Sequence, residues 1–132
     1  ASCLVGSEMC IRDRHRRRGF RTTGYHYYIR RDGTVLGTRS LELPGAHCRG
    51  HNKYSIGICY EGGLDARGNP KDTRTPEQRS ALHLLVYQLL QQFRNARVCG
   101  HRDLSPDLDG DGTVEPWEWV KQCPCFEVSK EF

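Results

Sequence analysis

Long hydrophobic runs are absent from this chain of 132 residues. A helix that crosses a bilayer needs about 18 or more apolar residues in a row, so we expect no membrane-spanning segment. No apolar stretch resembles a secretory signal, and the sequence therefore leaves the protein's location unknown. Repeats and low-complexity tracts are also absent, and a hydrophobic content of 36% suffices for one core. We expect a single domain that acts as a monomer.

Aromatic residues make up 9% of the chain and do not alternate with its basic residues. The formal net charge of +4 suits an anionic partner such as a nucleic acid, a membrane surface or a cell-wall polymer. A nucleic-acid-binding face combines basic and aromatic side chains, and this sequence lacks that combination. We therefore expect no nucleic-acid partner.

The seven cysteines lack the regular spacing of a disulfide scaffold. Only Cys123 and Cys125 lie close together in the sequence, and the others stand apart. This distribution favours small thiols in a reducing compartment over a disulfide framework.

The first residues differ in character from the rest. Residues 3–14, CLVGSEMCIRDR, resemble the translation of a transposase adapter used to prepare sequencing libraries, and they show neither helical nor strand periodicity. We interpret residues 1–14 as a non-native segment and expect the domain to span residues 15–132. A natural N-terminal arm is the alternative.

Several short segments have the composition of strands. Residues 24–29, GYHYYI, are aromatic and β-branched, and the pair Asp32-Gly33 then predicts a tight turn before a returning strand that contains Val35. Residues 55–60, SIGICY, and residues 97–100 predict two further strands.

One amphipathic helix is clearly marked. Thr75 is suited to cap it, Pro76 fits its first position and Gln78 completes a capping box. Apolar residues then recur at helical spacing as far as Phe93. Together these elements predict an α/β fold with a mixed sheet flanked by helices.

Two kinds of metal ligand follow the strand at residues 97–100. The side chains of His101 and Cys123 are suitable zinc ligands, because imidazole and thiolate groups bind this metal well. Their separation of 22 positions does not by itself indicate a shared ion, and two unrelated residues are the alternative.

An acidic segment lies between these two residues. It satisfies the pattern D-x-D-x-D-G-x5-E of a calcium-binding loop, with Gly112 at the bend. The expected calcium ligands are Asp107, Asp109, Asp111, Thr113 and Glu118. We predict a structural calcium loop at residues 107–118, with a plain Asp-Gly-rich turn as the alternative.

Five motifs together resemble one family. They are GYHYYIRRDGT, GAHCRGHNKYSIGICYEGG, a helix that begins with TPEQ, GHRDLSP and KQCPCF. Their order and spacing are similar to those of zinc-dependent N-acetylmuramoyl-L-alanine amidases, the type-2 amidases related to phage lysozyme-type amidases and peptidoglycan recognition proteins. The resemblance implies an enzyme that hydrolyses the amide between N-acetylmuramic acid and L-alanine in peptidoglycan. A non-catalytic peptidoglycan-binding module of the same fold is the alternative.

The resemblance also implies roles for individual residues. His101 and Cys123 match two of the family's three zinc ligands, whereas Tyr25 and Lys121 match its catalytic tyrosine and lysine. His47 and Asn52 fall on a loop that lines the substrate groove in such enzymes. A phage, a prophage or a bacterium are all possible sources.

The chain departs from the family pattern at its start. The family's first zinc ligand is a histidine at the end of an N-terminal strand, and here the adapter-like residues occupy that place. We expect the strand to be missing and the chain to bind zinc poorly and to be inactive, because two ligands cannot fix a tetrahedral site. Replacement of the ligand by Cys10 or His15 is the alternative.

Overall fold

The protein folds around one five-stranded sheet. The computed structural model describes residues 2–7, 25–41, 45, 55–106, 108–119 and 124–132, and for residues 2–7 it describes the backbone. The strand order is β3-β2-β4-β1-β5. The strands are β1 (Ser2–Ser7), β2 (Tyr27–Ile29), β3 (Val35–Gly37), β4 (Ser55–Tyr60) and β5 (Arg97–Gly100). The predicted mixed sheet is confirmed.

Four of the strands run in the same direction. Strand β4 is parallel to both β1 and β2, and β1 is parallel to β5. Only the edge strand β3 is antiparallel to its neighbour. The carboxyl ends of the four parallel strands therefore meet at one edge of the sheet, which is where open α/β sheets usually place their functional sites.

The expectation that the first strand is missing is wrong. Strand β1 lies inside the sheet, with Cys3 beside Ile56 of β4 on one side and beside Val98 of β5 on the other. An inner strand of a parallel sheet is covered on both faces, so it does not need alternating apolar and polar residues. The absence of periodicity in this segment was therefore no evidence against a strand.

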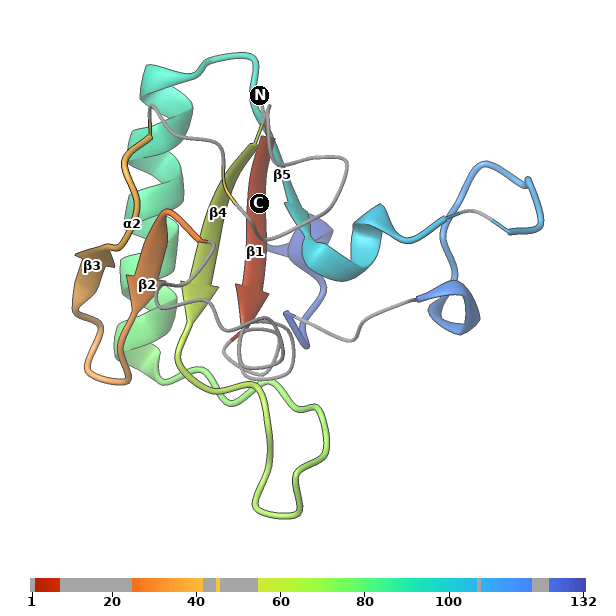
Figure 1. The fold of residues 1–132 in the computed structure, drawn as a ribbon, viewed down its shortest axis with the longest axis horizontal. Coiled ribbons are helices and arrows are strands. Elements are labelled where there is room, and N and C mark those ends of the chain that lie inside the picture. The colour runs from red at the N-terminus through yellow and green to blue at the C-terminus, as the bar shows by residue number, and fades with distance from the viewer. Residues whose placement is uncertain (1, 8–24, 42–44, 46–54, 107, 120–123) are drawn as a thin grey trace.

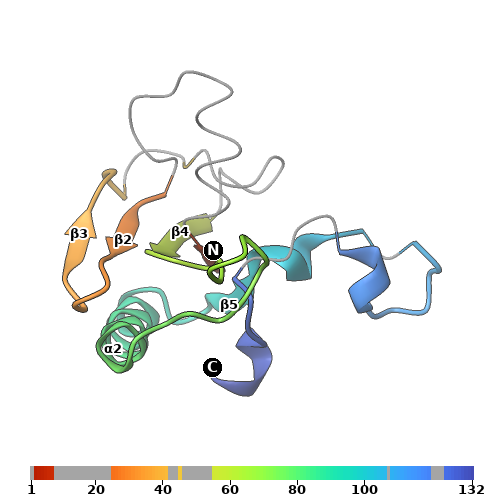
Figure 2. The same cartoon turned by 90° about the horizontal axis from the view of Figure 1, so that it is seen from below.

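Helix α2 (Pro76–Gln92) covers one face of the sheet (Figures 1 and 2). Its predicted start is confirmed, because the Thr75 hydroxyl accepts a hydrogen bond from the Gln78 amide and the Gln78 side chain accepts one from the Thr75 amide. Helix residues Leu82, Leu85, Val86 and Leu89 pack with Ile29 of β2 and with Ile56, Ile58 and Tyr60 of β4.

The predicted hairpin joins β2 to β3. Its turn contains Asp32, whose carboxylate accepts the Thr34 amide at 2.8 Å, and Gly33, whose φ is +88°. A Cβ atom at Gly33 would also lie 2.9 Å from the Glu77 carbonyl oxygen. Both the turn and its contact with the first turn of α2 therefore require glycine at this position.

The C-terminal segment, residues 124–132, packs on the same face of the sheet as α2 (Figure 2). Phe126 and Val128 belong to the same core as the helix. The buried guanidinium of Arg74 lies 3.4 Å above the Phe126 ring and pairs with Asp72 at 2.9 Å and with Glu131 at 2.6 Å. Arg74 thus joins the chain just before α2 to the last residues of the protein.

This ion-pair network predicts a loss of stability in acid. Burial tends to raise the pKa of Asp72, but hydrogen bonds and charge from Arg74 outweigh it and lower that pKa below its ordinary 3.8. Hydrogen bonding to Arg74 likewise lowers the pKa of Glu131 below its ordinary 4.5. Because the two pKa values are lower in the folded state than in the unfolded state, the ion pairs stabilise the fold fully at a pH above the ordinary pKa values. This stabilisation is lost as the pH falls through the lowered pKa values of the folded state.

We therefore expect the urea midpoint to stay constant from about pH 6 to pH 5 and to fall steadily below about pH 4.5. Urea unfolding followed by circular dichroism at each pH measures this. A midpoint that does not change between pH 6 and pH 3 would contradict the role given to the two carboxylates.

In the part of the chain that the structure describes, no helix has the length and apolar character needed to cross a membrane. Cys59 is buried, whereas Cys99 and Cys125 are partly buried. The other four cysteines lie outside the residues with described side chains.

Candidate functional site at the carboxyl edge of the sheet

His101 stands at the carboxyl end of β5. It opens the short 3-10 turn η2 (His101–Leu104), and only 6% of its surface is exposed. The Asp103 carboxylate accepts the Gly100 amide at 2.7 Å and fixes the change from strand to turn. The imidazole is therefore held in one place at the edge of the sheet.

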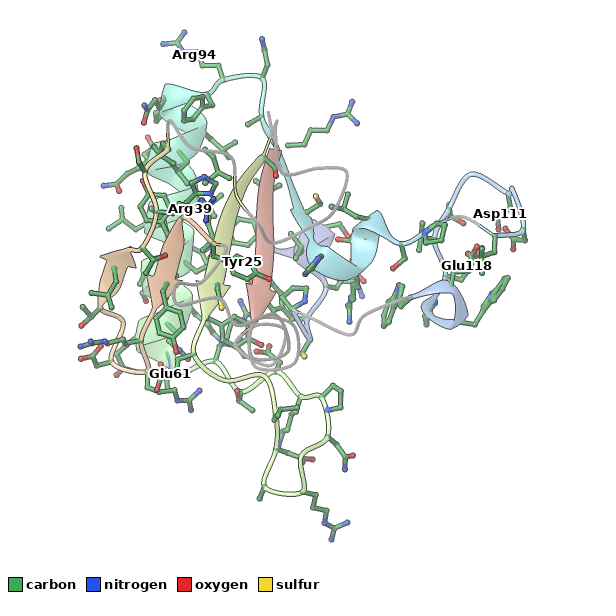
Figure 3. The ribbon with its side chains drawn as sticks, in the orientation of Figure 1. Tyr25, Arg39, Glu61, Arg94, Asp111 and Glu118 are labelled. Atoms are coloured by element: carbon green, nitrogen blue, oxygen red, sulfur yellow. The ribbon has the colours of Figure 1, made fainter. Side chains whose placement is uncertain are left out.

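The Tyr25 phenol meets this imidazole although the two residues are 76 positions apart. Its hydroxyl oxygen lies 3.4 Å from Nδ1 of His101, and the Tyr25 side chain is buried. The Thr38 hydroxyl donates to the Tyr25 carbonyl at 2.7 Å, which anchors the backbone at this point. Figure 3 shows Tyr25 over the middle of the sheet. The structure thus brings together two of the residues that the sequence singled out.

The neighbouring His26 has a different role. It is buried, its amide donates to the Gly57 carbonyl at 2.9 Å and its Nδ1 accepts the Gly57 amide at 3.1 Å. These bonds join the start of β2 to β4. His26 therefore supports the strand that presents Tyr25.

Four expected site residues lie outside the described residues: His47, Asn52, Lys121 and Cys123. The residue that follows Cys123 is described. Pro124 packs so closely against Gly100 that a Cβ atom at Gly100 would lie 2.7 Å from the proline Cδ. Gly100 and Pro124 are thus in contact. Gly100 directly precedes His101 and Pro124 directly follows Cys123, the two expected zinc ligands.

A buried hydrogen bond fixes Pro124. The Tyr60 hydroxyl at the end of β4 donates to the Pro124 carbonyl at 2.5 Å. Burial raises the pKa of Tyr60 far above its ordinary value, so the hydroxyl stays protonated and able to donate. The donor types fit zinc, since a buried imidazole and a thiolate one residue from a fixed proline are ligands this metal prefers.

The acidic segment forms a loop that projects from the sheet, with Asp111 and Glu118 far from it in Figure 3. Gly112 has a φ of +90°, as the predicted bend requires. Ligand atoms of Asp109, Asp111 and Glu115 lie within 4.8 Å of one another. Three carboxylates therefore gather on this loop.

The arrangement of this loop differs from the prediction at Glu118. That carboxylate is buried and accepts the backbone amides of Leu108 and Glu115, so it holds the loop closed. Glu115, which was not among the expected ligands, stands beside Asp111 instead. Position 115 is the ninth of a twelve-residue calcium loop that begins at 107, so the pattern itself contained this signal.

Glu115 interacts with the neighbouring carboxylates of Asp111 and Glu118. Hydrogen bonds with Asp111 and then with Glu118 raise the pKa of Glu115 to about 7, because Glu115 must keep a proton to donate to another carboxylate. Thr113 donates its amide to Asp111 at 2.9 Å and its hydroxyl to the same oxygen at 3.0 Å. Asp107 lies outside the described residues.

Comparison with known proteins assigns this chain to one family. A family model described as N-acetylmuramoyl-L-alanine amidase matches residues 6–124. An uncharacterized protein of Haemophilus influenzae is 47% identical over 97 residues, which is 74% of this chain and 84% of that protein. The endolysin of Enterobacteria phage K11 is 37% identical over 120 residues, which is 91% of this chain and 70% of the endolysin.

Solved structures share the fold. The N-acetylmuramoyl-L-alanine amidase LysC from Clostridium intestinale has a TM-score of 0.68 at 24% identity, covering 98% of this chain and 79% of that one. Bumblebee PGRP-SA has a TM-score of 0.67 at 19% identity, covering 98% and 78%. At these identities the likeness concerns the fold alone.

Proposed function

This chain belongs to the N-acetylmuramoyl-L-alanine amidase family, and we propose that it uses the sheet edge at His101 as a zinc-dependent active site. The family's reaction is hydrolysis of the amide between N-acetylmuramic acid and L-alanine, so the protein is a hydrolase whose substrate is peptidoglycan. The observation that supports this site is the approach of the Tyr25 hydroxyl to Nδ1 of His101 at 3.4 Å.

Each residue of the proposed site has a chemical role. His101 and Cys123 would hold zinc, which when bound polarises the scissile carbonyl and lowers the pKa of a water molecule. Tyr25 is placed to orient that water or to pass a proton to the leaving amine. Lys121 would stabilise negative charge that develops on the carbonyl oxygen. His47 and Asn52 would line the groove that receives the substrate.

The weak point of the proposed site is its third ligand. Val5 pairs with Gly100, and the residues that follow this pair are Gly6 of β1 and His101, which opens η2. Glycine offers no ligand at the strand end where the family places a histidine. We therefore propose that the chain as written binds zinc weakly and has low activity, with Cys10 or His15 as the alternative third ligand. Both lie outside the described residues.

A digest of purified peptidoglycan tests the function. With zinc in excess, we expect stem peptides with a free L-alanine amino group to be released slowly, and His101→Ala to abolish the release. Mass spectrometry of the soluble fraction detects these peptides. If the chain sediments with the wall and releases no peptide, even after Gly6 is replaced by histidine, the protein would be a non-catalytic peptidoglycan-binding module instead.

We propose that the loop at residues 107–118 binds calcium as a structural ion. Support comes from the complete sequence pattern and from the meeting of Asp109, Asp111 and Glu115. Asp109, Asp111 and Glu115 would hold the ion, while Glu118 keeps the loop closed through the amides of Leu108 and Glu115.

Calcium is then expected to stabilise the protein. A site at a hundredfold excess over its dissociation constant contributes about 2.7 kcal/mol, which corresponds to a rise of several degrees in the thermal midpoint. Differential scanning calorimetry with and without 1,2-bis(2-aminophenoxy)ethane tetraacetate measures it, and Asp111→Asn should remove the response. An unchanged midpoint in the parent chain would mean that the loop is a plain turn.

We also propose that the protein is encoded by a phage or a prophage and acts as a monomer. Phage endolysins that align with 91% of the chain support the first point. Sedimentation at several concentrations tests the second, and a mass that increases with concentration would contradict it.

A further inference from the structure

Two large apolar side chains stand exposed on the acidic loop. Trp117 is 64% exposed and Leu108 is 65% exposed. The amide of Leu108 donates to the carboxylate of Glu118, the residue that follows Trp117, so the two segments that carry these side chains are tied together. We call this pair the loop tip. A tryptophan presented in this way is unusual on a protein surface and commonly marks a binding site.

Internal hydrogen bonds hold the loop tip in one conformation. The buried Glu118 carboxylate accepts amides from both sides of the loop, at Leu108 and at Glu115. Trp117 lies within the short turn η3 (Pro116–Glu118), directly before Glu118. Little backbone freedom is then lost when a partner binds, which favours affinity.

Both ends of the loop are tied to the proposed active site. Its first residues follow directly from η2, which begins at His101. Trp119, the residue directly after the loop, stacks on the guanidinium of Arg102, and the distance from Cζ of Arg102 to the ring centroid is 3.9 Å. Arg102 is the sequence neighbour of His101, and it also pairs with Glu127 at 3.4 Å. A partner at the loop tip is therefore fixed relative to the site of hydrolysis.

The negative charge of the loop indicates which kind of partner can bind there. Asp109, Asp111 and Glu115 gather on the same loop as Trp117 and Leu108, and an acidic surface of this kind repels anionic lipid headgroups. A glycan strand made of N-acetylated sugars is uncharged, and the apolar face of each sugar ring stacks on an indole. The glycan is also part of the polymer that the family hydrolyses.

We infer that Trp117 and Leu108 form a second binding site, separate from the proposed zinc site, for the glycan strand of peptidoglycan. The site holds the polymer while the stem peptide enters the groove at His101. The inference assumes that peptidoglycan is the substrate, but it does not require that the chain hydrolyse it.

The experiment measures binding without hydrolysis. His101→Ala chains that also contain Trp117→Ala are incubated with purified sacculi, and the bound fraction is measured by sedimentation. We expect Trp117→Ala to weaken binding at least about tenfold, as the loss of a central aromatic contact typically does. Tyr87→Ala is the matched control, since Tyr87 is an aromatic residue 63% exposed on α2, and it should bind like the parent.

A second probe separates this inference from the amidase proposal. Chitotetraose contains N-acetylated sugars but no peptide amide, so it reports on the glycan site alone. We expect chitotetraose to change the tryptophan fluorescence of the parent chain. In the Trp117→Phe variant, we expect chitotetraose to change the fluorescence no more than an addition of buffer does. Equal binding of parent and Trp117→Ala to sacculi would overturn the inference. So would a Trp117-dependent interaction with phosphatidylglycerol vesicles or with a second copy of the chain in place of the glycan.

Discussion

Replacing Gly6 with histidine is expected to raise the zinc affinity of the chain by at least about 100-fold. Loss of a residue that only hydrogen-bonds to a metal ligand already lowers metal affinity about 10- to 100-fold, and a direct ligand contributes more. Val5 pairs with Gly100, and position 6 and His101 follow these two residues along the chain. Residues in register on adjacent strands project to the same face, so we expect an imidazole at position 6 to face the ion that His101 binds. Amidase activity on peptidoglycan should rise with the affinity.

Competition with a fluorescent zinc chelator measures this affinity. Val5→His is the matched control, because alternate residues of a strand face opposite sides of the sheet and this imidazole would point away from the site. Equal gains from both variants would contradict the proposed geometry. Tight binding by the parent that is lost in Cys10→Ser or His15→Ala would show instead that one of these residues already supplies the third ligand.

The Arg74→Met variant is expected to lower the free energy of unfolding by about 2 to 3 kcal/mol. Breaking a buried ion pair typically costs about 3 to 5 kcal/mol, and this cost is reduced here because Asp72 and Glu131 keep about a quarter of their side-chain surface in water. Methionine keeps a long apolar side chain at this position but removes the guanidinium, and with it the two ion pairs and the contact of the guanidinium with the Phe126 ring. The C-terminal segment should detach first.

Urea unfolding and amide hydrogen exchange test this prediction together. Exchange should increase in residues 124–132 more than in β4. Arg79→Met is the matched control, because Arg79 also contacts Asp72, at 3.4 Å, but is 52% exposed. A surface pair of this kind contributes about 0 to 1 kcal/mol. Similar losses in the two variants would contradict the special role of Arg74.

Local signals predicted the parts of the fold that local interactions determine. The start of α2 depends on Thr75, Pro76 and Gln78, which lie within four residues of one another, and the hairpin turn depends on Asp32 and Gly33. Each of these features is satisfied by nearby atoms. Sequence alone was therefore sufficient to place them.

Features that depend on distant residues were not predicted. The network of Arg74 joins residues 57 positions apart, and neither partner has a distinctive sequence environment. The inclusion of β1 depends on its place between two other strands. The proximity of Tyr25 and His101 followed from the family resemblance, because no periodicity relates two residues that are 76 positions apart.

X-ray absorption at the zinc edge tests the central claim most directly, namely that His101 and Cys123 bind one zinc ion. For the Gly6→His chain loaded with one equivalent of zinc, we expect one sulfur ligand at about 2.3 Å and nitrogen ligands at about 2.0 to 2.1 Å. Cys123→Ser should remove the sulfur contribution, and His101→Ala should remove one nitrogen. A first shell of oxygen and nitrogen only, or a sulfur signal that survives Cys123→Ser, would contradict the claim.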